Sequence, residues 1–124
     1  MAYDMKVMDE DDYLHVVVTG DNTPEDVAGY LDQIRRVCAE RALSKVLIEE
    51  DLTGPQLGTV DVYDVISAAS QEVAPAIRSI AFVDTNPQHA FAPMKFAETV
   101  AVNRGVHVKV FRDVPSAKAW IRQR

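Results

Sequence analysis

Hydrophobic and polar positions along the chain follow two different periods. In residues 13–19 they alternate, with Leu14, Val16 and Val18 on one face and mostly apolar residues on the other, which is typical of a strand inside a sheet. Shorter apolar segments predict further strands at 3–8, 45–50, 78–83 and 106–111. An acidic turn separates the first two segments, so we expect them to form a hairpin.

The remaining segments have the spacing of amphipathic helices. The first is predicted from residue 24 to about 42, with Thr23 as its N-cap and Pro24 in its first turn. Its predicted buried stripe is Val27, Tyr30, Leu31, Ile34, Val37 and Cys38. A second helix is predicted at 59–73, a third ends before Gly105 with Pro93 suited to its first turn, and Asp113 caps a fourth.

The order of these elements is ββαβαβαβα, which predicts an α/β fold. Strands joined through helices are expected to be parallel, while the opening hairpin adds one antiparallel strand to a mixed sheet flanked by helices. At 124 residues the chain is of single-domain size, so we assign residues 1–124 to one domain.

Composition narrows the classes of function. The chain has 13 Lys and Arg against 19 Asp and Glu, a net charge of −6, which argues against a nucleic-acid partner. A single cysteine, Cys38, excludes an intramolecular disulfide and fits a reducing compartment. No apolar segment approaches the length of a membrane span, and the N-terminus lacks the pattern of a secretory signal, so we expect a cytoplasmic protein.

Four segments in this order resemble the STAS domains, in particular the SpoIIAA-like group, which shares a CRAL-TRIO-like fold. The matching segments read YLHVVVTGDNTPED, SKVLIEEDLTG, IRSIAFVD and GVHVKVFRDVPSAKAWI. The resemblance implies a STAS-like domain that acts as a non-enzymatic regulatory or protein-interaction module in bacteria. It implies a protein partner whose identity is open, and a homodimer is one assembly that we consider.

One departure from the family concerns its phosphorylated turn. Anti-sigma-factor antagonists of this family carry an Asp-Ser pair after the third strand, whereas the segment 49–59 here has no such pair and is longer. Its only hydroxyl side chains are Thr53 and Thr59, so Thr53, Gly54 and Thr59 mark a candidate interaction or phospho-switch loop. Thr59 is alternatively no more than the N-cap of the second helix.

Catalytic and metal sites find little support in the residues. The predicted carboxyl ends of the strands carry Glu50, Asp51, Asp84 and Asp113, but loop and capping positions explain these acids without a metal. His15 and His107 lie within strands, and His89 lies alone in a loop. With no nucleophile near a base and no phosphate-binding glycine motif, we expect no catalytic residue, no metal and no cofactor.

The segment 90–96 contains Phe91, Met94 and Phe96 near a helix start. These side chains form either part of the core, a pocket for a small apolar ligand, or an exposed patch. Helical spacing places Phe91 and Met94 on one face and Phe96 off it, so we expect the first two in the core and Phe96 partly exposed. Our alternative function, suggested by the CRAL-TRIO-like relatives, is binding of a small apolar ligand or lipid between the sheet and the third helix.

Overall fold

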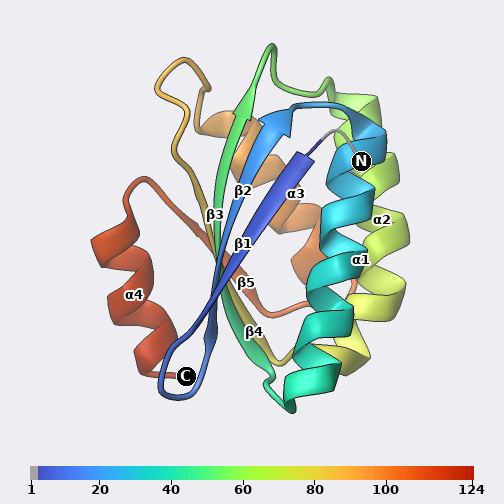
Figure 1. The fold of residues 1–124 in the computed structure, drawn as a ribbon. Helices are drawn as coiled ribbons and strands as arrows, with labels where there is room; N and C mark the ends of the chain where they lie inside the picture. Colours follow the sequence, from blue (N-terminus) through green and yellow to red (C-terminus); the bar gives the residue numbers. More distant parts are fainter. Residues whose placement is uncertain (1–2) are drawn as a thin grey trace.

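Five strands form one mixed sheet in the computed structural model, which describes residues 3–124 (Figure 1). The strands are β1 (Tyr3–Asp9), β2 (Leu14–Asp21), β3 (Lys45–Thr53), β4 (Ser79–Asp84) and β5 (Val108–Phe111). The helices are α1 (Pro24–Arg41), α2 (Thr59–Ala76), α3 (Ala92–Val102) and α4 (Val114–Arg122). Met1 and Ala2, on which the prediction of no secretory signal partly rests, lie outside the described residues.

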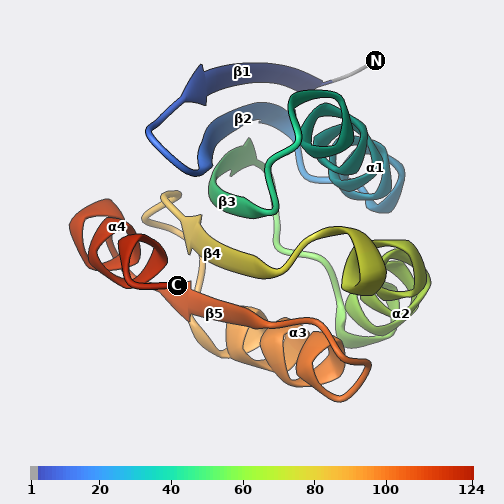
Figure 2. The same cartoon turned by 90° about the horizontal axis from the view of Figure 1, so that it is seen from below.

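The predicted fold class and element order are confirmed. The strand order is β1-β2-β3-β4-β5, with β1 antiparallel to β2 and all later neighbours parallel. Because each helical crossover advances by one strand in the same direction, crossovers of one hand place all their helices on one face. Figure 2 shows α1, α2 and α3 on one side of the sheet and α4 on the other.

This strand order also bears on where a ligand could bind. Ligands of doubly wound sheets bind where the strand order reverses and neighbouring crossovers leave on opposite faces. Here the order never reverses, so α1, α2 and α3 lie side by side on one face and enclose a space between themselves and the sheet.

The ends of the elements are set partly by local signals. Thr23 caps α1 by accepting a hydrogen bond from the Asp26 amide. Asp113 caps α4 by accepting one from the Ser116 amide. Pro93 lies in the first turn of α3, as its lack of an N–H predicts. These three predictions are confirmed.

Other ends differ from prediction. Strand β3 continues to Thr53 because Gly20 and Asp21 of β2 remain paired with it beyond Glu50. The N-cap of α2 is Gly58, so Thr59 is the first helical residue and the prediction that it is the cap is wrong. The last strand begins at Val108, because the Val106 amide is used to bond Ala101 at the end of α3.

Two apolar clusters hold the layers together. The larger lies between the sheet and α1–α3 and includes Tyr30, Ile34 and Cys38 of the predicted stripe. The smaller joins the other face of the sheet to α4 through Leu47, Ala117 and Ile121. Among residues 3–124, no helix is long and apolar enough to cross a membrane.

Candidate ligand cavity

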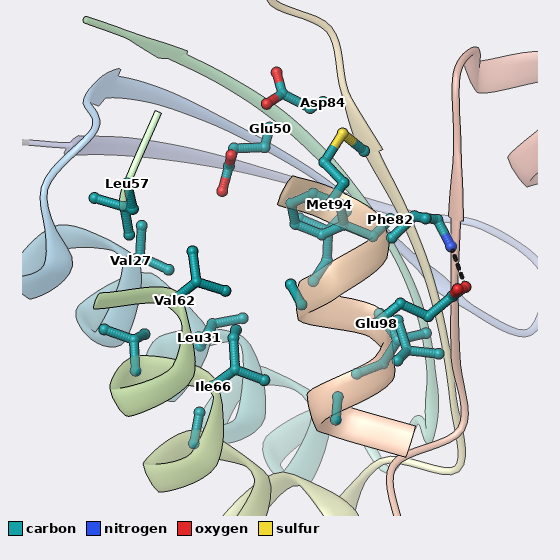
Figure 3. Close-up of a pocket in the computed structure, with 18 of the residues that line it drawn as sticks. Val27, Leu31, Glu50, Leu57, Val62, Ile66, Phe82, Asp84, Met94 and Glu98 are labelled. Carbon is teal, nitrogen blue, oxygen red and sulfur yellow. Dashed lines mark hydrogen bonds between the residues drawn. The ribbon is translucent and has the colours of Figure 1, made fainter. Parts of the chain in front are cut away.

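A cavity of about 140 Å³ lies between the sheet and the three helices α1, α2 and α3 (Figure 3). Its walls are mainly aliphatic side chains from α2, α3 and strands β3, β4 and β5. The volume is close to the roughly 150 Å³ of an engineered apolar cavity that stays dry and accepts benzene. A small apolar molecule of that size therefore fits the space.

Small side chains on the helices create this space. The face of α2 that lines the cavity consists of Val62, Val65, Ile66, Ala69, Ser70 and Val73. On α3, Ala97 and Ala101 take the corresponding positions. Since none of these side chains is longer than isoleucine, they leave apolar volume open between the helices and the sheet.

One carboxylate is placed at the apolar wall. Glu50 follows Val46 and Ile48 on the same face of the central strand β3, and it is only 7% exposed. Figure 3 shows its carboxylate directed into the space between α1 and α3. The Tyr30 hydroxyl, itself buried on α1, donates a hydrogen bond to Glu50 Oε2.

Burial changes the acidity of both partners. Removal from water raises the pKa of Glu50 from 4.5 to about 7, since the hydrogen bond from Tyr30 offsets only part of that effect and Asp84 adds to it. Burial, followed by the proximity of Glu50, raises the pKa of Tyr30 well above its ordinary value, so Tyr30 remains a donor. Glu50 is therefore divided between its charged and neutral forms near neutral pH.

A second acid, Asp84 of β4, lies opposite Glu50 in the register of β3 and β4. Its carboxylate already has partners. Its Oδ2 lies 2.7 Å from His89 Nδ1, and its Oδ1 accepts the Asn86 amide at 2.9 Å. The other ring nitrogen, His89 Nε2, lies 2.8 Å from the Gly54 carbonyl. The expectation that His89 is isolated is therefore wrong, because it joins two loops.

The environment of His89 favours its charged form. Burial lowers its pKa, but the hydrogen bonds to Gly54 and Asp84 raise the pKa more, so the net shift is upward. Both ring nitrogens face acceptors, so both carry protons in this arrangement. A histidine held in this way has no free lone pair with which to act as a general base.

The same two loops are joined again at the edge of the cavity. Gln56, before α2, donates through Nε2 to the Ala90 carbonyl at 2.9 Å and accepts from the Ala90 amide at 2.8 Å. Asn86 donates through Nδ2 to the Leu52 carbonyl at 2.8 Å. We call these contacts, with His89 to Gly54, the loop clasp. Gln56 and the adjacent Leu57 also line the cavity, so the clasp belongs to its wall.

The residues predicted as a pocket or patch have separate positions. Met94 is buried and lines the cavity. Phe91 and Phe96 are partly exposed and are not among the lining residues. The expected partial exposure of Phe96 is confirmed, whereas the expectation that Phe91 lies in the core is wrong: the centre of its ring lies 4.2 Å from Arg112 Cζ. Only Met94 of the three is therefore placed to contact a ligand there.

The candidate switch residues lie at the surface. Thr53, Gly54 and Thr59 are all exposed, and the Thr53 hydroxyl bonds the Gly20 carbonyl at 3.1 Å. Gly54 has φ +92°, a conformation that favours glycine, and its carbonyl is the acceptor for His89 in the loop clasp. Of these three residues, Gly54 takes part in the loop clasp, which forms part of the cavity wall.

The two other histidines have structural partners, and the cysteine is buried. His15 pairs with Glu49 at 2.9 Å on the face covered by α4, and His107 Nδ1 lies 3.2 Å from the Ser79 hydroxyl. Burial raises the pKa of Cys38 to about 11, so its thiol stays protonated. Within the described part of the chain, no three His, Cys, Asp or Glu side chains are grouped so as to hold a metal ion.

Sequence reasoning missed Tyr30 and Gln56 as site residues and treated Glu50 as part of the strand end. A signal was present for Glu50: residues 46, 48, 50 and 52 share one face of a strand, and the other three are apolar. An acid in that position is buried unless the strand has ended. No family model matches the chain, and no curated protein matches it significantly, so its function is inferred from this site.

Proposed function

We propose that the protein binds a small, mainly apolar ligand in the cavity between the sheet and α1–α3 and does no chemistry on it. The observation that carries this proposal is the cavity of about 140 Å³ with its aliphatic wall. Well-packed interiors leave few voids larger than a water molecule, so an apolar space of this size is a candidate for a bound molecule. It has the features of a ligand site, mostly apolar with few polar groups.

The absence of catalysis in this proposal has two supports. His89 has no free acceptor nitrogen, and burial and hydrogen bonding hold Tyr30 as a donor to Glu50. Glu50 alone would have to act as both acid and base. Recognition of a polar group on the ligand requires only one such carboxylate.

Toluene is a suitable probe of the cavity, because it has about the size of benzene and no polar group. In a ¹H–¹⁵N NMR titration we expect saturable shifts at the amides of Val62, Met94 and Ala97. Amides of α4, such as Ala117, report on the opposite face and should move little. Shifts confined to α4, or no saturable shifts at all, would contradict the proposal.

A filling variant tests the same site. Met94→Trp directs a larger side chain into the cavity, and we expect it to abolish toluene binding while the fold persists. The matched control is Phe96→Trp, on the same helix but outside the lining residues, which should bind toluene like the parent protein. If Met94 were tightly packed core instead, Met94→Trp would destabilise the fold by about 1–3 kcal/mol.

A second candidate function is regulation of a protein partner, as the STAS resemblance implies for a bacterial cytoplasmic protein. It is favoured by the exposure of Val60 and Tyr63, which are 71% and 47% exposed on the first turns of α2, next to exposed Thr59. Leu57, just before them, lines the cavity, so a ligand would contact the segment that precedes this surface. Mass spectrometry of protein from its native host tests whether Thr53 or Thr59 is a phospho-switch. If neither threonine is phosphorylated under any growth condition, the switch is contradicted.

A further inference from the structure

The charged groups that line the cavity are all acidic. They are Glu50, Asp84 and Glu98, and within residues 3–124 no Lys, Arg or His is among the lining residues. Asp84 is paired with His89, while Glu98 accepts the Val110 amide at 3.0 Å and is paired with Lys95. The dashed contact in Figure 3 shows Glu98 engaged with β5.

Glu50 differs from these two acids in having acceptor capacity left. Tyr30 donates to Oε2, and among the described residues no other side chain donates to this carboxylate. A carboxylate accepts about four hydrogen bonds, and a buried one without enough donors costs free energy. The residue is only 7% exposed and its carboxylate is directed into the cavity (Figure 3), so a group that occupies the cavity is placed to donate to the remaining lone pairs in place of water.

We propose, on the basis of the proposed function, that the ligand is a small amphiphile with an apolar body and one protonated amine, and that Glu50 accepts hydrogen bonds from this amine. The aliphatic walls hold the body, and the ammonium group supplies up to three N–H donors. Its positive charge complements the acidic side chains that line the cavity, and Glu50 is already desolvated by the fold.

The same geometry selects against anions. A ligand carboxylate or phosphate would lie beside Glu50. Among residues 3–124 no lining residue is cationic, and the nearby charge of His89 is already paired with Asp84, so the like charges would repel strongly. A neutral alcohol gives one hydrogen bond to Glu50 without charge complementarity. We therefore expect affinity to fall in the order amine, alcohol, hydrocarbon, with the anion weakest.

Four probes of one size separate these contributions: benzylamine, benzyl alcohol, toluene and benzoate. Dissociation constants are measured by NMR titration at pH 7.5 in about 0.15 M salt, where exposed charges more than about 8 Å apart are largely screened. A hydrogen bond to a charged group predicts that benzylamine binds about tenfold or more tightly than toluene. Toluene should displace benzylamine, because both occupy the same cavity.

The variant Glu50→Gln isolates the carboxylate. It keeps an oxygen acceptor for Tyr30 and removes the charge, so benzylamine should lose about tenfold in affinity while toluene changes less than about twofold. Unchanged toluene binding also shows that the variant is folded with its cavity intact. The matched control is Glu49→Gln, the adjacent residue, which pairs with His15 instead of facing the cavity; it should bind all four probes as the parent protein does.

The outcomes separate this inference from the proposed function. If toluene binds but benzylamine binds no more tightly, or benzoate binds equally well, the amine inference is wrong and the cavity function stands. If benzylamine binds tightly but Glu50→Gln leaves its affinity unchanged, the amine is held elsewhere and the inference is equally wrong. If none of the four probes binds at the cavity, both proposals fail together.

Discussion

At the scale of single residues, Glu50 places a carboxylate at a buried position where an aliphatic side chain would make the fold more stable. Its neighbours on the same face of β3 are Ile48 and Leu52, both fully buried, and an aliphatic residue would suit the position. The carboxylate instead has its pKa raised to about 7, chiefly by burial. Residues that cost stability where they stand are frequently retained for a function, and this supports Glu50 as the polar group of the site.

The pKa of Glu50 predicts a pH-dependent stability. In the unfolded chain its pKa is near 4.5, and in the folded protein it is about 7, so the folded state binds the proton more tightly. The free energy of unfolding then falls as the pH rises from about 4.5 to about 7 and stays low above that range. Ionisation of Glu50 accounts for about 3 kcal/mol of this decrease in the free energy of unfolding.

The variant Glu50→Gln tests this prediction, because it removes the titrating group while keeping the acceptor for Tyr30. Urea unfolding at pH 5 and pH 8 should show the variant gaining stability relative to the parent protein as the pH rises. The control is Glu49→Gln, on the opposite face of the strand. Identical pH profiles for the two variants would show that burial of Glu50 is not the cause.

At the scale of elements, α1 is held by both its cap and its buried stripe. Thr23 satisfies one amide at the start of the helix, whereas Ile34 lies in the core and is 1% exposed. A cap contributes about 0.5–2 kcal/mol and a buried isoleucine about 2–5 kcal/mol when either is replaced by alanine.

We therefore expect Ile34→Ala to destabilise the protein more than Thr23→Ala in urea unfolding. Glu40→Ala, at an exposed position of the same helix, should change stability by less than about 0.5 kcal/mol. A larger loss from Thr23→Ala than from Ile34→Ala would mean that the buried face of α1 has been assigned wrongly.

The elements also show which features the sequence predicts. The caps Thr23 and Asp113 and the position of Pro93 depend on a few neighbouring residues, so they could be predicted. The end of β3 at Thr53 depends on pairing with β2, more than thirty positions away, which no local pattern records.

The candidate site is predicted less well, because it is built between elements. The sequence context of Met94 indicates a pocket, core or patch residue, and Met94 lines the cavity. The loop clasp brings Gln56 to Ala90 and His89 to Gly54, contacts between segments more than thirty residues apart. The open volume depends on the distances between α2, α3 and the sheet, which the sequence does not record. The small residues Ala69, Ala97 and Ala101 are its one signal in the sequence.

At the scale of the whole molecule, topology determines where a ligand has room. The monotonic strand order puts three helices on one face and leaves α4 alone on the other (Figures 1 and 2). The cavity lies in the three-helix layer, and the loop clasp joins the β3–α2 and β4–α3 loops at its edge. A ligand in this space contacts α1, α2, α3 and the central strands together.

The central claim, that this space is a ligand site, is tested most directly by a crystal exposed to iodobenzene. The iodine gives an anomalous signal that locates the probe without reference to any assumed contact. We predict one dominant iodine peak between Met94, Val62 and Phe82, with the sheet and helices unchanged in their arrangement. A cavity that stays empty while iodine occupies other sites, such as the α4 face, would contradict the claim.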